Sequence, residues 1–360
     1  MLAYLRRLAG SHQITLISFE KTSPSDALRR ELATLGVDWR PLRYHRRPPV
    51  LATAIDVLAG RRALSVAARE GRPAILHVRS YVPALIALLA RPRTGGRLLF
   101  DIRGFWADER VEGGLWRAGG FLYRIAKRCE RWFFAEADAV VTLTEASVPQ
   151  IRTWTAAPVD VIPTCVELDR FAGRTTRPDG PRAVWCGSIG TWYRFDLAPA
   201  VAAALSLPLT VITRQEELAR EQLGDSSAEI RSAAPEAIPA TLFEGDIGLC
   251  LIVSSFSKVA SAPTRFAEYL AAGMPVLVTP GVGDLELLVE RNGVGVVLRG
   301  EDQRSLRAAA SAMLALTRDP ETSERCRRLA RERFAVESGS ARYAAIYARL
   351  IAGATQARPG

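Results

Sequence analysis

The sequence predicts an α/β protein made of two tandem Rossmann-like domains, each with a doubly wound parallel sheet. Short apolar runs alternate with longer helical stretches along the 360 residues, which is the pattern of β-α-β units. A polar linker, Gly173 to Pro181, interrupts this alternation once, and the pattern then restarts. Hydrophobic residues make up 48% and charged residues 24% of the chain, as in globular proteins, and the length suggests about two domains.

The first half shows one departure from the Rossmann pattern. A helix over residues 2–8 precedes the first strand, whereas a Rossmann domain begins with a strand and a glycine turn. The first N-terminal strand is therefore missing. We interpret this as a shortened start of the chain, and a native fold without the strand is the alternative. The predicted strands are 14–19, 74–78, 97–102, 139–143 and 160–162, and the further helices are 83–90 and 115–135.

The second half repeats the alternation. The predicted strands are 183–186, 209–212, 247–253, 275–278 and 294–298, and the helices are 263–272, 284–291, 302–317, 321–334 and 338–352. We expect the last eight residues, 353–360, to be frayed. Ligands of such sheets bind at the carboxyl ends of the strands, so a site shared by two domains lies in the cleft between them.

The positive charge of the chain is concentrated in its first half. The net charge is +10; residues 1–170 hold 26 basic and 17 acidic residues (+9), and residues 171–360 hold 22 and 21 (+1). This asymmetry predicts an anionic partner for the first half, either a membrane surface or an acidic substrate. We expect no nucleic-acid partner, because no stretch that combines basic and aromatic residues lies in the context of a known nucleic-acid-binding fold.

Cysteine and histidine usage predicts a reduced protein without a metal. The five cysteines are far apart, and no pair of the three histidines has metal-ligand spacing. No run of 18 apolar residues and no signal peptide is present, so we expect a cytoplasmic protein without a membrane span.

Three segments resemble the GT-B glycosyltransferases, especially glycosyltransferase family 4 (glycosyl transferases group 1). They are VIPTCVELDRF (161–171), CGSIGTWYRFD (186–196) and SAPTRFAEYLAAGMPV (261–276). Their order and spacing are similar to those of the family, and the resemblance covers roughly residues 140–352. It implies the GT-B fold, with an acceptor domain over 1–165, a nucleotide-sugar domain over 166–336, and a closing helix over 337–352 that packs back towards the first domain.

The resemblance also implies an activity. Such enzymes move a hexosyl group from a nucleotide-diphosphate-sugar to an acceptor, with retention of configuration and without a metal or other cofactor. The acceptor would be a cell-surface glycan or a lipid-linked molecule, as in polysaccharide biosynthesis. A GT-B-shaped sugar-nucleotide epimerase and a non-catalytic nucleotide-sugar-binding relative are the alternatives.

The second-half segments contain residue types that suit a nucleotide diphosphate. Glycines after a strand let backbone N–H groups approach an anion, and the N-terminus of a following helix favours negative charge. Hydroxyls can cap a helix, arginines pair with phosphate, and a carboxylate accepts from the two ribose hydroxyls. The alternative for Arg265 and Glu268 is a surface ion pair. The predicted donor-binding residues are Gly187, Ser188, Gly190, Arg194, Thr213, Arg214, Ser261, Thr264, Arg265 and Glu268.

The chain departs from the family pattern at three positions. Ala260 stands where the family usually has a first glutamate, and Ser188 and Tyr193 replace an Arg and a Lys of the donor turn. We expect Arg194 to substitute for the missing charge, together with Arg265, because a diphosphate leaving group needs charge stabilisation when no metal is bound.

The predicted catalytic residues lie after two strands of the first half. The loop from Asp101 to Trp116 crowds charged, aromatic and glycine residues at the end of a strand, and Arg79 ends the preceding strand at the same rim. These side chains can hold an acceptor hydroxyl or remove its proton. A salt-bridged loop and a structural histidine are the alternatives. The candidates are His77, Asp101, Arg103, Asp108 and Glu109.

Residues 115–135 mix aromatic and basic side chains. Such a helix can lie on an anionic membrane, which predicts a peripheral protein at the inner face of the membrane. A core-packed helix with a solvated basic face is the alternative.

Overall fold

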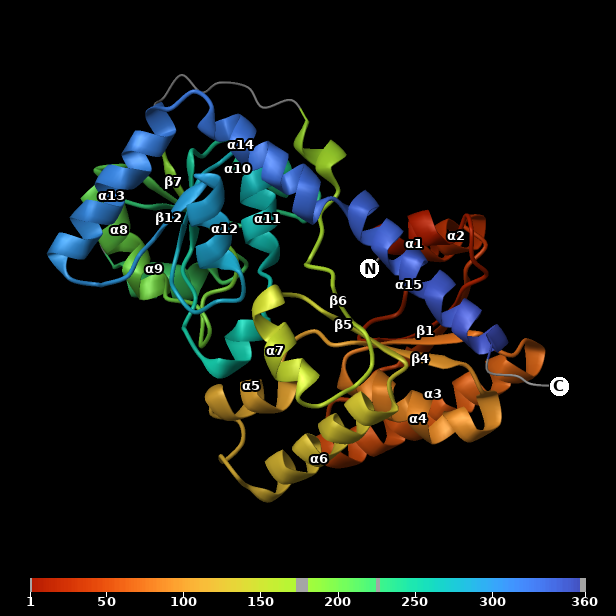
Figure 1. The fold of residues 1–360 in the computed structure, drawn as a ribbon. Coiled ribbons are helices and arrows are strands. Elements are labelled where there is room, and N and C mark those ends of the chain that lie inside the picture. The colour runs from red at the N-terminus through yellow and green to blue at the C-terminus, as the bar shows by residue number, and fades with distance from the viewer. Residues whose placement is uncertain (1, 173–180, 225–226, 357–360) are drawn as a thin grey trace.

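The computed structural model describes residues 2–172, 181–224 and 227–356, which form two lobes joined by the chain (Figure 1). Most of the linker predicted over residues 173–181 lies outside the described residues. All strand pairs of both lobes are parallel, so the predicted doubly wound architecture is confirmed. Within the described ranges, no helix has both the length and the hydropathy needed to cross a membrane.

The C-terminal lobe contains a six-stranded sheet of order β12-β11-β10-β7-β8-β9. Its strands are β7 (Ala183–Cys186), β8 (Leu209–Ile212), β9 (Glu229–Arg231), β10 (Ile247–Cys250), β11 (Val276–Val278) and β12 (Gly295–Val297). Successive side chains of a strand point to opposite faces. Val184 and Cys186 therefore join one apolar cluster, and Ala183 and Trp185 join another on the opposite face.

Helices cover both faces of this sheet. The helices α11 (Thr264–Ala271), α12 (Leu285–Asn292) and α14 (Thr322–Leu329) contribute to the first cluster, and α8 (Ala198–Leu205), α9 (Glu216–Leu223) and α13 (Gln303–Arg318) contribute to the second. A short helix, α10 (Ile238–Leu242), also belongs to the first cluster. The predicted helix over 321–334 is α14 followed by a π-helical turn, Ala330–Phe334.

The sheet of the N-terminal lobe is divided in two. The strands β1 (Thr15–Glu20) and β2 (Asp38–Arg43) form one pair, and β3 (Ile75–Arg79), β4 (Arg97–Asp101), β5 (Ala139–Thr142) and β6 (Val159–Val161) form a separate sheet. In the Rossmann order one strand stands between the strands equivalent to β1 and β3. Among the described residues no strand pairs there, and β1 is only half-buried while β5 is fully buried.

Helices also cover both faces of the β3–β6 sheet. On one face lie α3 (Pro49–Glu70), α4 (Tyr81–Thr94) and α6 (Phe121–Glu136). On the other face, α1 (Leu2–Leu8) and α15 (Val336–Gln356) pack together. The remaining helices are α2 (Asp26–Thr34), α5 (Trp106–Glu112) and α7 (Val148–Arg152).

Two helix predictions were wrong at their ends. The helix predicted from residue 115 begins at Phe121, because Gly119 has a positive φ of 67° and Gly120 is the extended N-cap residue. The tail predicted to be frayed from residue 353 continues as helix to Gln356, where the Arg97 guanidinium donates to the Gly353 carbonyl (3.1 Å). Residues 357–360 lie outside the described part of the chain.

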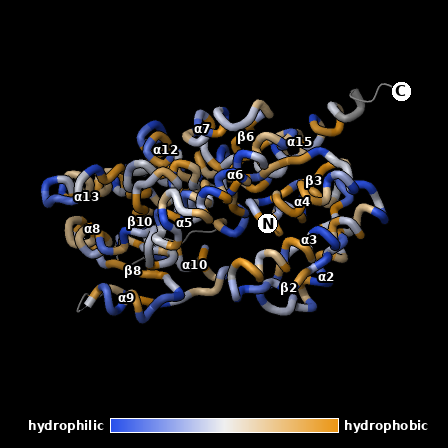
Figure 2. Tube along the Cα trace, turned by 90° about the horizontal axis from the view of Figure 1, so that it is seen from below, coloured by the Kyte–Doolittle hydropathy of each residue, from blue (hydrophilic) through white to orange (hydrophobic). Residues whose placement is uncertain are grey.

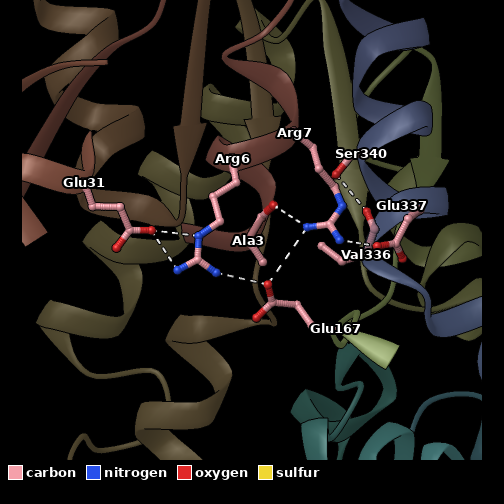
Figure 3. A network of polar contacts seen from close by, with 8 residues as sticks. All are labelled: Ala3, Arg6, Arg7, Glu31, Glu167, Val336, Glu337 and Ser340. Carbon is pink, nitrogen blue, oxygen red and sulfur yellow. Dashed lines mark hydrogen bonds and ion pairs between the residues drawn. The ribbon is translucent and has the colours of Figure 1, made fainter. Parts of the chain in front are cut away.

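The chain passes between the lobes twice, and the two crossings pair with each other. The Val166 amide donates to the Phe334 carbonyl (2.8 Å), and the Val336 amide donates to the Val166 carbonyl (3.1 Å). Figure 3 shows α1 beside this pair: Arg6 contacts Glu31 (2.7 Å) and Glu167 (3.1 Å), and Arg7 contacts Glu337. Both crossings are therefore tied to the N-terminal lobe.

Candidate active site between the lobes

The glycine turn of the C-terminal lobe follows β7. Gly187 has a φ of 154°. Two residues later, the Ile189 amide donates to the side-chain oxygen of Gln215 (2.7 Å). Ser188 and Gly190 are exposed in the same turn. The helix that follows this turn, α8, begins only at Ala198, because the chain first runs beside the residues after β10, where the Arg194 amide donates to the Leu251 carbonyl (3.0 Å).

Tyr269 anchors α11 against the end of β7. Its ring is fully buried, and its hydroxyl accepts from the Cys186 amide (2.8 Å) and donates to the Val184 carbonyl (3.2 Å). This contact holds the preceding residue, Glu268, beside the glycine turn. Burial raises the pKa of the Cys186 thiol to about 11, and the neighbouring charges of Arg265 and Glu268 also act on that thiol.

Glu268 is buried and ion-paired with Arg265. Burial raises the pKa of the Glu268 carboxyl, and the Arg265 guanidinium partly offsets that rise. The structure thus brings Arg265 and Glu268 together at the turn. The predicted caps were wrong, because Pro263 is the N-cap residue of α11 and no side chain caps it; Ser261 and Thr264 stand on either side of Pro263.

The other predicted donor residues lie apart from this pair. The Arg194 guanidinium donates to Asp196 (2.8 Å) and Glu301 (2.8 Å) on the surface of its own lobe. Thr213 is buried after β8, where its hydroxyl accepts from the Gln215 amide (3.1 Å), and Arg214 is exposed. Gln215 contacts both the turn and this loop, and no sequence signal pointed to it.

Asp101 lies at the carboxyl end of β4 and is only 1% exposed. Its Oδ2 lies 3.5 Å from His77 Nε2 and 3.9 Å from Arg79 Nε, and its Oδ1 lies 3.7 Å from Arg103 Nη1. Burial acts to raise the pKa of this carboxyl, but His77 and Arg103 outweigh burial and hold it below its usual value. Three predicted residues, His77, Asp101 and Arg103, therefore meet at one point.

Two tyrosines of α15 complete this cluster. The Tyr343 hydroxyl donates to Asp101 (2.9 Å), and the Tyr347 hydroxyl contacts His77 Nδ1 (2.7 Å). Within the described residues, Asp101 Oδ1 and His77 Nε2 are buried without a hydrogen-bond partner. The tyrosines are about 240 to 270 positions away in the sequence, so only the packing of α15 brings them here.

The two acidic residues predicted in the loop after residue 101 lie instead in the helix α5, and they have different surroundings. Asp108 is buried within the N-terminal lobe, where it accepts from the Tyr123 hydroxyl (2.9 Å) and from Lys127 (2.9 Å). Glu109 instead crosses to the other lobe and accepts from Lys258 Nζ (2.5 Å). Both carboxylates are thus ion-paired, which agrees with the salt-bridged alternative for this loop.

Lys258 was not predicted as a site residue. It is buried, and its ammonium lies 3.8 Å from the ring centre of Trp192, which belongs to the glycine turn segment. A weak signal was available, because Lys258 is one of three lysines in a chain whose other basic residues are arginines.

The lobes touch through α5 and a 3₁₀ turn, Phe256–Ala260, that follows β10. Glu112 accepts from the Ser255 hydroxyl (2.7 Å) and the Ser257 amide (3.1 Å). The Phe105 ring stacks on Phe256 with centres 5.0 Å apart. Because α5 follows β4 and the 3₁₀ turn follows β10, the carboxyl ends of the two sheets face each other across this contact.

Two doubly wound parallel sheets that face each other in this way are the GT-B fold, which is a fold of glycosyltransferases. Residues 1–165 match the family model of the glycosyl transferase 4-like domain. No curated protein matches the sequence significantly.

Solved structures of this fold cover nearly the whole chain. The sucrose-phosphate synthase of Thermosynechococcus elongatus is 16% identical with a TM-score of 0.70, and the match covers 98% of this chain and 92% of that chain. HepE of Anabaena, in complex with UDP and glucose, is 12% identical with a TM-score of 0.64, covering 96% and 95%. WaaG, a glycosyltransferase involved in lipopolysaccharide biosynthesis, is 13% identical with a TM-score of 0.59, covering 94% of each chain.

Proposed function

We propose that this chain transfers a hexosyl group from a nucleotide-diphosphate-sugar to a glycan or lipid-linked acceptor. The observation that carries the proposal is the Arg265–Glu268 pair beside Gly187, at the carboxyl end of β7. A carboxylate there suits the two ribose hydroxyls, and the guanidinium suits phosphate oxygens. HepE, which has this fold, was solved with UDP and with UDP-glucose, and this likeness supports the same kind of donor.

The acceptor is assigned to the N-terminal lobe. Asp101 has a lowered pKa and is ionised at neutral pH, so it can accept a hydrogen bond from an acceptor hydroxyl. The Arg103 guanidinium adds positive charge beside it, and His77 Nε2 lies 3.5 Å from its Oδ2. We assign retention of configuration and metal-independent catalysis to the reaction, with Arg265 as a charge that stabilises the leaving diphosphate.

A non-catalytic nucleotide-sugar-binding protein is the second candidate. Ala260 is fully buried at the position where the family resemblance expects a carboxylate, so no side chain there can contact a sugar. Binding of a sugar nucleotide without transfer to any acceptor and without hydrolysis would favour this candidate. Conversion of the sugar nucleotide to its epimer would favour the epimerase alternative.

Calorimetric titration with UDP, GDP and their glucose or mannose conjugates tests the donor assignment. For Glu268→Gln we expect roughly tenfold weaker donor binding or more, because an ionic hydrogen-bond acceptor for ribose is removed. Glu290→Gln is the matched control, since Glu290 is an exposed glutamate of the same lobe that pairs with Arg299. Unchanged affinity in Glu268→Gln would exclude the ribose assignment.

The location of the protein is part of the proposal. We place it in the cytoplasm, at the inner face of the membrane, where a lipid-linked acceptor and a sugar nucleotide are both accessible. Residues 115–135 are the segment assigned to contact with an anionic membrane.

A further inference from the structure

Three helices form the outer layer of one face of the N-terminal lobe. In this layer α4 lies between α3 and α6 and contacts both. Figure 1 shows the three helices together along the lower side of the lobe, and Figure 2, seen from below, shows hydrophobic and hydrophilic residues mixed along them. We call this surface the three-helix face.

The face exposes large apolar side chains of α3 in a regular stripe. Leu51, Ile55 and Leu58 are spaced by four and three residues, which places them on one side of the helix, and Leu58 is 63% exposed. Val66 continues the same stripe, and Val50 lies beside it. The opposite side of α3 is buried through Ala52, Asp56 and Val57, so the stripe points away from the lobe.

The helix α6 repeats this arrangement. Phe121, Ile125 and Trp132 share one side of the helix; Phe121 is 77% and Trp132 is 38% exposed. Leu122 lies beside them, and Leu89 is exposed on α4 between the two stripes. Most of the exposed large apolar side chains of the described residues therefore lie on these three helices.

The charges of the face are positive. Six arginines are exposed on it and form no ion pair with the described residues: Arg62, Arg69, Arg93, Arg124, Arg128 and Arg131. The acidic side chains of the same helices are either buried or paired. Asp56 and Glu130 are buried against His45 and Lys127, and Glu70 and Glu136 lie at the helix ends with Arg40 and Arg91.

We infer that the three-helix face is a docking surface for an anionic lipid bilayer, on which it lies flat. Apolar side chains surrounded by arginines suit the boundary between head groups and acyl chains, where the arginines meet lipid phosphates. A symmetric pairing of two copies through the same face would oppose arginines to arginines, so charge complementarity favours the bilayer. The proposed membrane surface therefore includes α3 and α4 in addition to residues 115–135, the segment that the sequence predicts to lie on a membrane.

The position of the face fits a membrane-bound acceptor. The helix α6 follows α5, whose Glu109 and Glu112 contact the C-terminal lobe. The contact between the lobes therefore lies next to the bilayer side of the N-terminal lobe. The docking inference does not rest on the proposed sugar transfer, since vesicle binding is measured without a donor.

Co-sedimentation with vesicles tests the inference. We expect binding to vesicles of phosphatidylglycerol and phosphatidylcholine, and little binding to vesicles of phosphatidylcholine alone. The triple variant Leu51→Ser, Ile55→Ser, Leu58→Ser should bind at least tenfold more weakly than the parent protein. A second triple variant, Arg124→Gln, Arg128→Gln, Arg131→Gln, should bind roughly a hundredfold more weakly, because each arginine contributes about fivefold to the affinity.

The control replaces exposed apolar residues elsewhere, Leu287→Ser with Ile351→Ser, and should bind as the parent does. Thermal unfolding of each variant separates loss of binding from loss of fold; if the α3 variant fails to fold, the arginine variant decides. Equal binding to neutral and anionic vesicles, or full binding by the variants, overturns the inference. A dimer in sedimentation analysis that the α3 variant dissociates would assign the face to a second copy instead.

Discussion

Asp101 is the residue whose environment is most specialised. A carboxylate that is almost completely removed from water is costly unless positive charge and hydrogen bonds compensate it. Arg79 and Arg103 supply the positive charge, Tyr343 supplies the hydrogen bond, and His77 Nε2 lies 3.5 Å away. These partners come from β3, from the segment after β4 and from α15, so Asp101 connects the closing helix to the sheet.

Asp101→Asn is predicted to lower the free energy of unfolding by roughly 2–4 kcal/mol at neutral pH, because the half-buried guanidinium groups of Arg79 and Arg103 lose their buried counter-charge. The pKa of Asp101 is lower in the folded than in the unfolded protein, so its stabilisation is present above the unfolded value and disappears as the pH falls through the folded one. Urea unfolding at neutral and at strongly acidic pH measures both effects. An equal loss at both pH values would contradict this account.

At the scale of elements, the packing of α11 on β10 positions the donor residues. Gly248 of β10 faces the Tyr269 ring, and a Cβ at this position would lie 2.4 Å from that ring. Only glycine therefore allows Tyr269 to reach the Cys186 amide at the end of β7. A small residue within a strand thus sets the position of Glu268 at the glycine turn.

Gly248→Ala is predicted to displace Tyr269, to destabilise the C-terminal lobe by about 1–3 kcal/mol, and to weaken nucleotide binding. Denaturant unfolding followed by tryptophan fluorescence, together with calorimetry, measures the two effects. Gly71→Ala is the control, because a Cβ at Gly71 meets no atom within 4 Å. A fully stable Gly248→Ala protein with normal affinity would show that the ring does not position α11.

At the scale of the whole molecule, the contacts between the two lobes differ in character, and Asp284 also joins them by accepting from the Glu145 and Ala146 amides (2.8 Å each). The paired crossings near Val166 and Val336 are held by backbone hydrogen bonds and by the arginines of α1. The contact of α5 with the turn after β10 is held by side chains: Glu109 with Lys258 and Glu112 with Ser255. Side-chain contacts can separate without loss of secondary structure, so the α5 contact can open while the paired crossings act as the hinge.

The variant Glu112→Gln, Lys258→Met is predicted to separate the lobes on the α5 side. Small-angle X-ray scattering should give a larger radius of gyration than for the parent protein, with unchanged circular dichroism. Arg194→Gln is the control, since it removes ion pairs within one lobe only. A variant with the radius of the parent protein would show that the other contacts suffice to keep the lobes together.

Part of the fold was predictable because it depends on local pattern. Fully buried parallel strands such as Ala139–Thr142 and Ala183–Cys186 are almost continuous apolar runs, and the helix before the first strand, Leu2–Leu8, was also predicted. The elements β2, α2, α3, α5, α7 and β9 were missed. In α3 the apolar stripe is exposed and faces away from the core, so its periodicity does not report burial.

For the site, the sequence by itself indicated the segments that carry the candidate side chains. They are His77 on β3 with Asp101 and Arg103 at the end of β4 in one lobe, and Gly187 after β7 with Arg265 and Glu268 on α11 in the other. Only the tertiary structure decided their partners. Tyr343 reaches Asp101 and Lys258 reaches Glu109 from 242 and 149 positions away. Contacts at such separation depend on how helices and lobes pack, which a local pattern of residues does not contain.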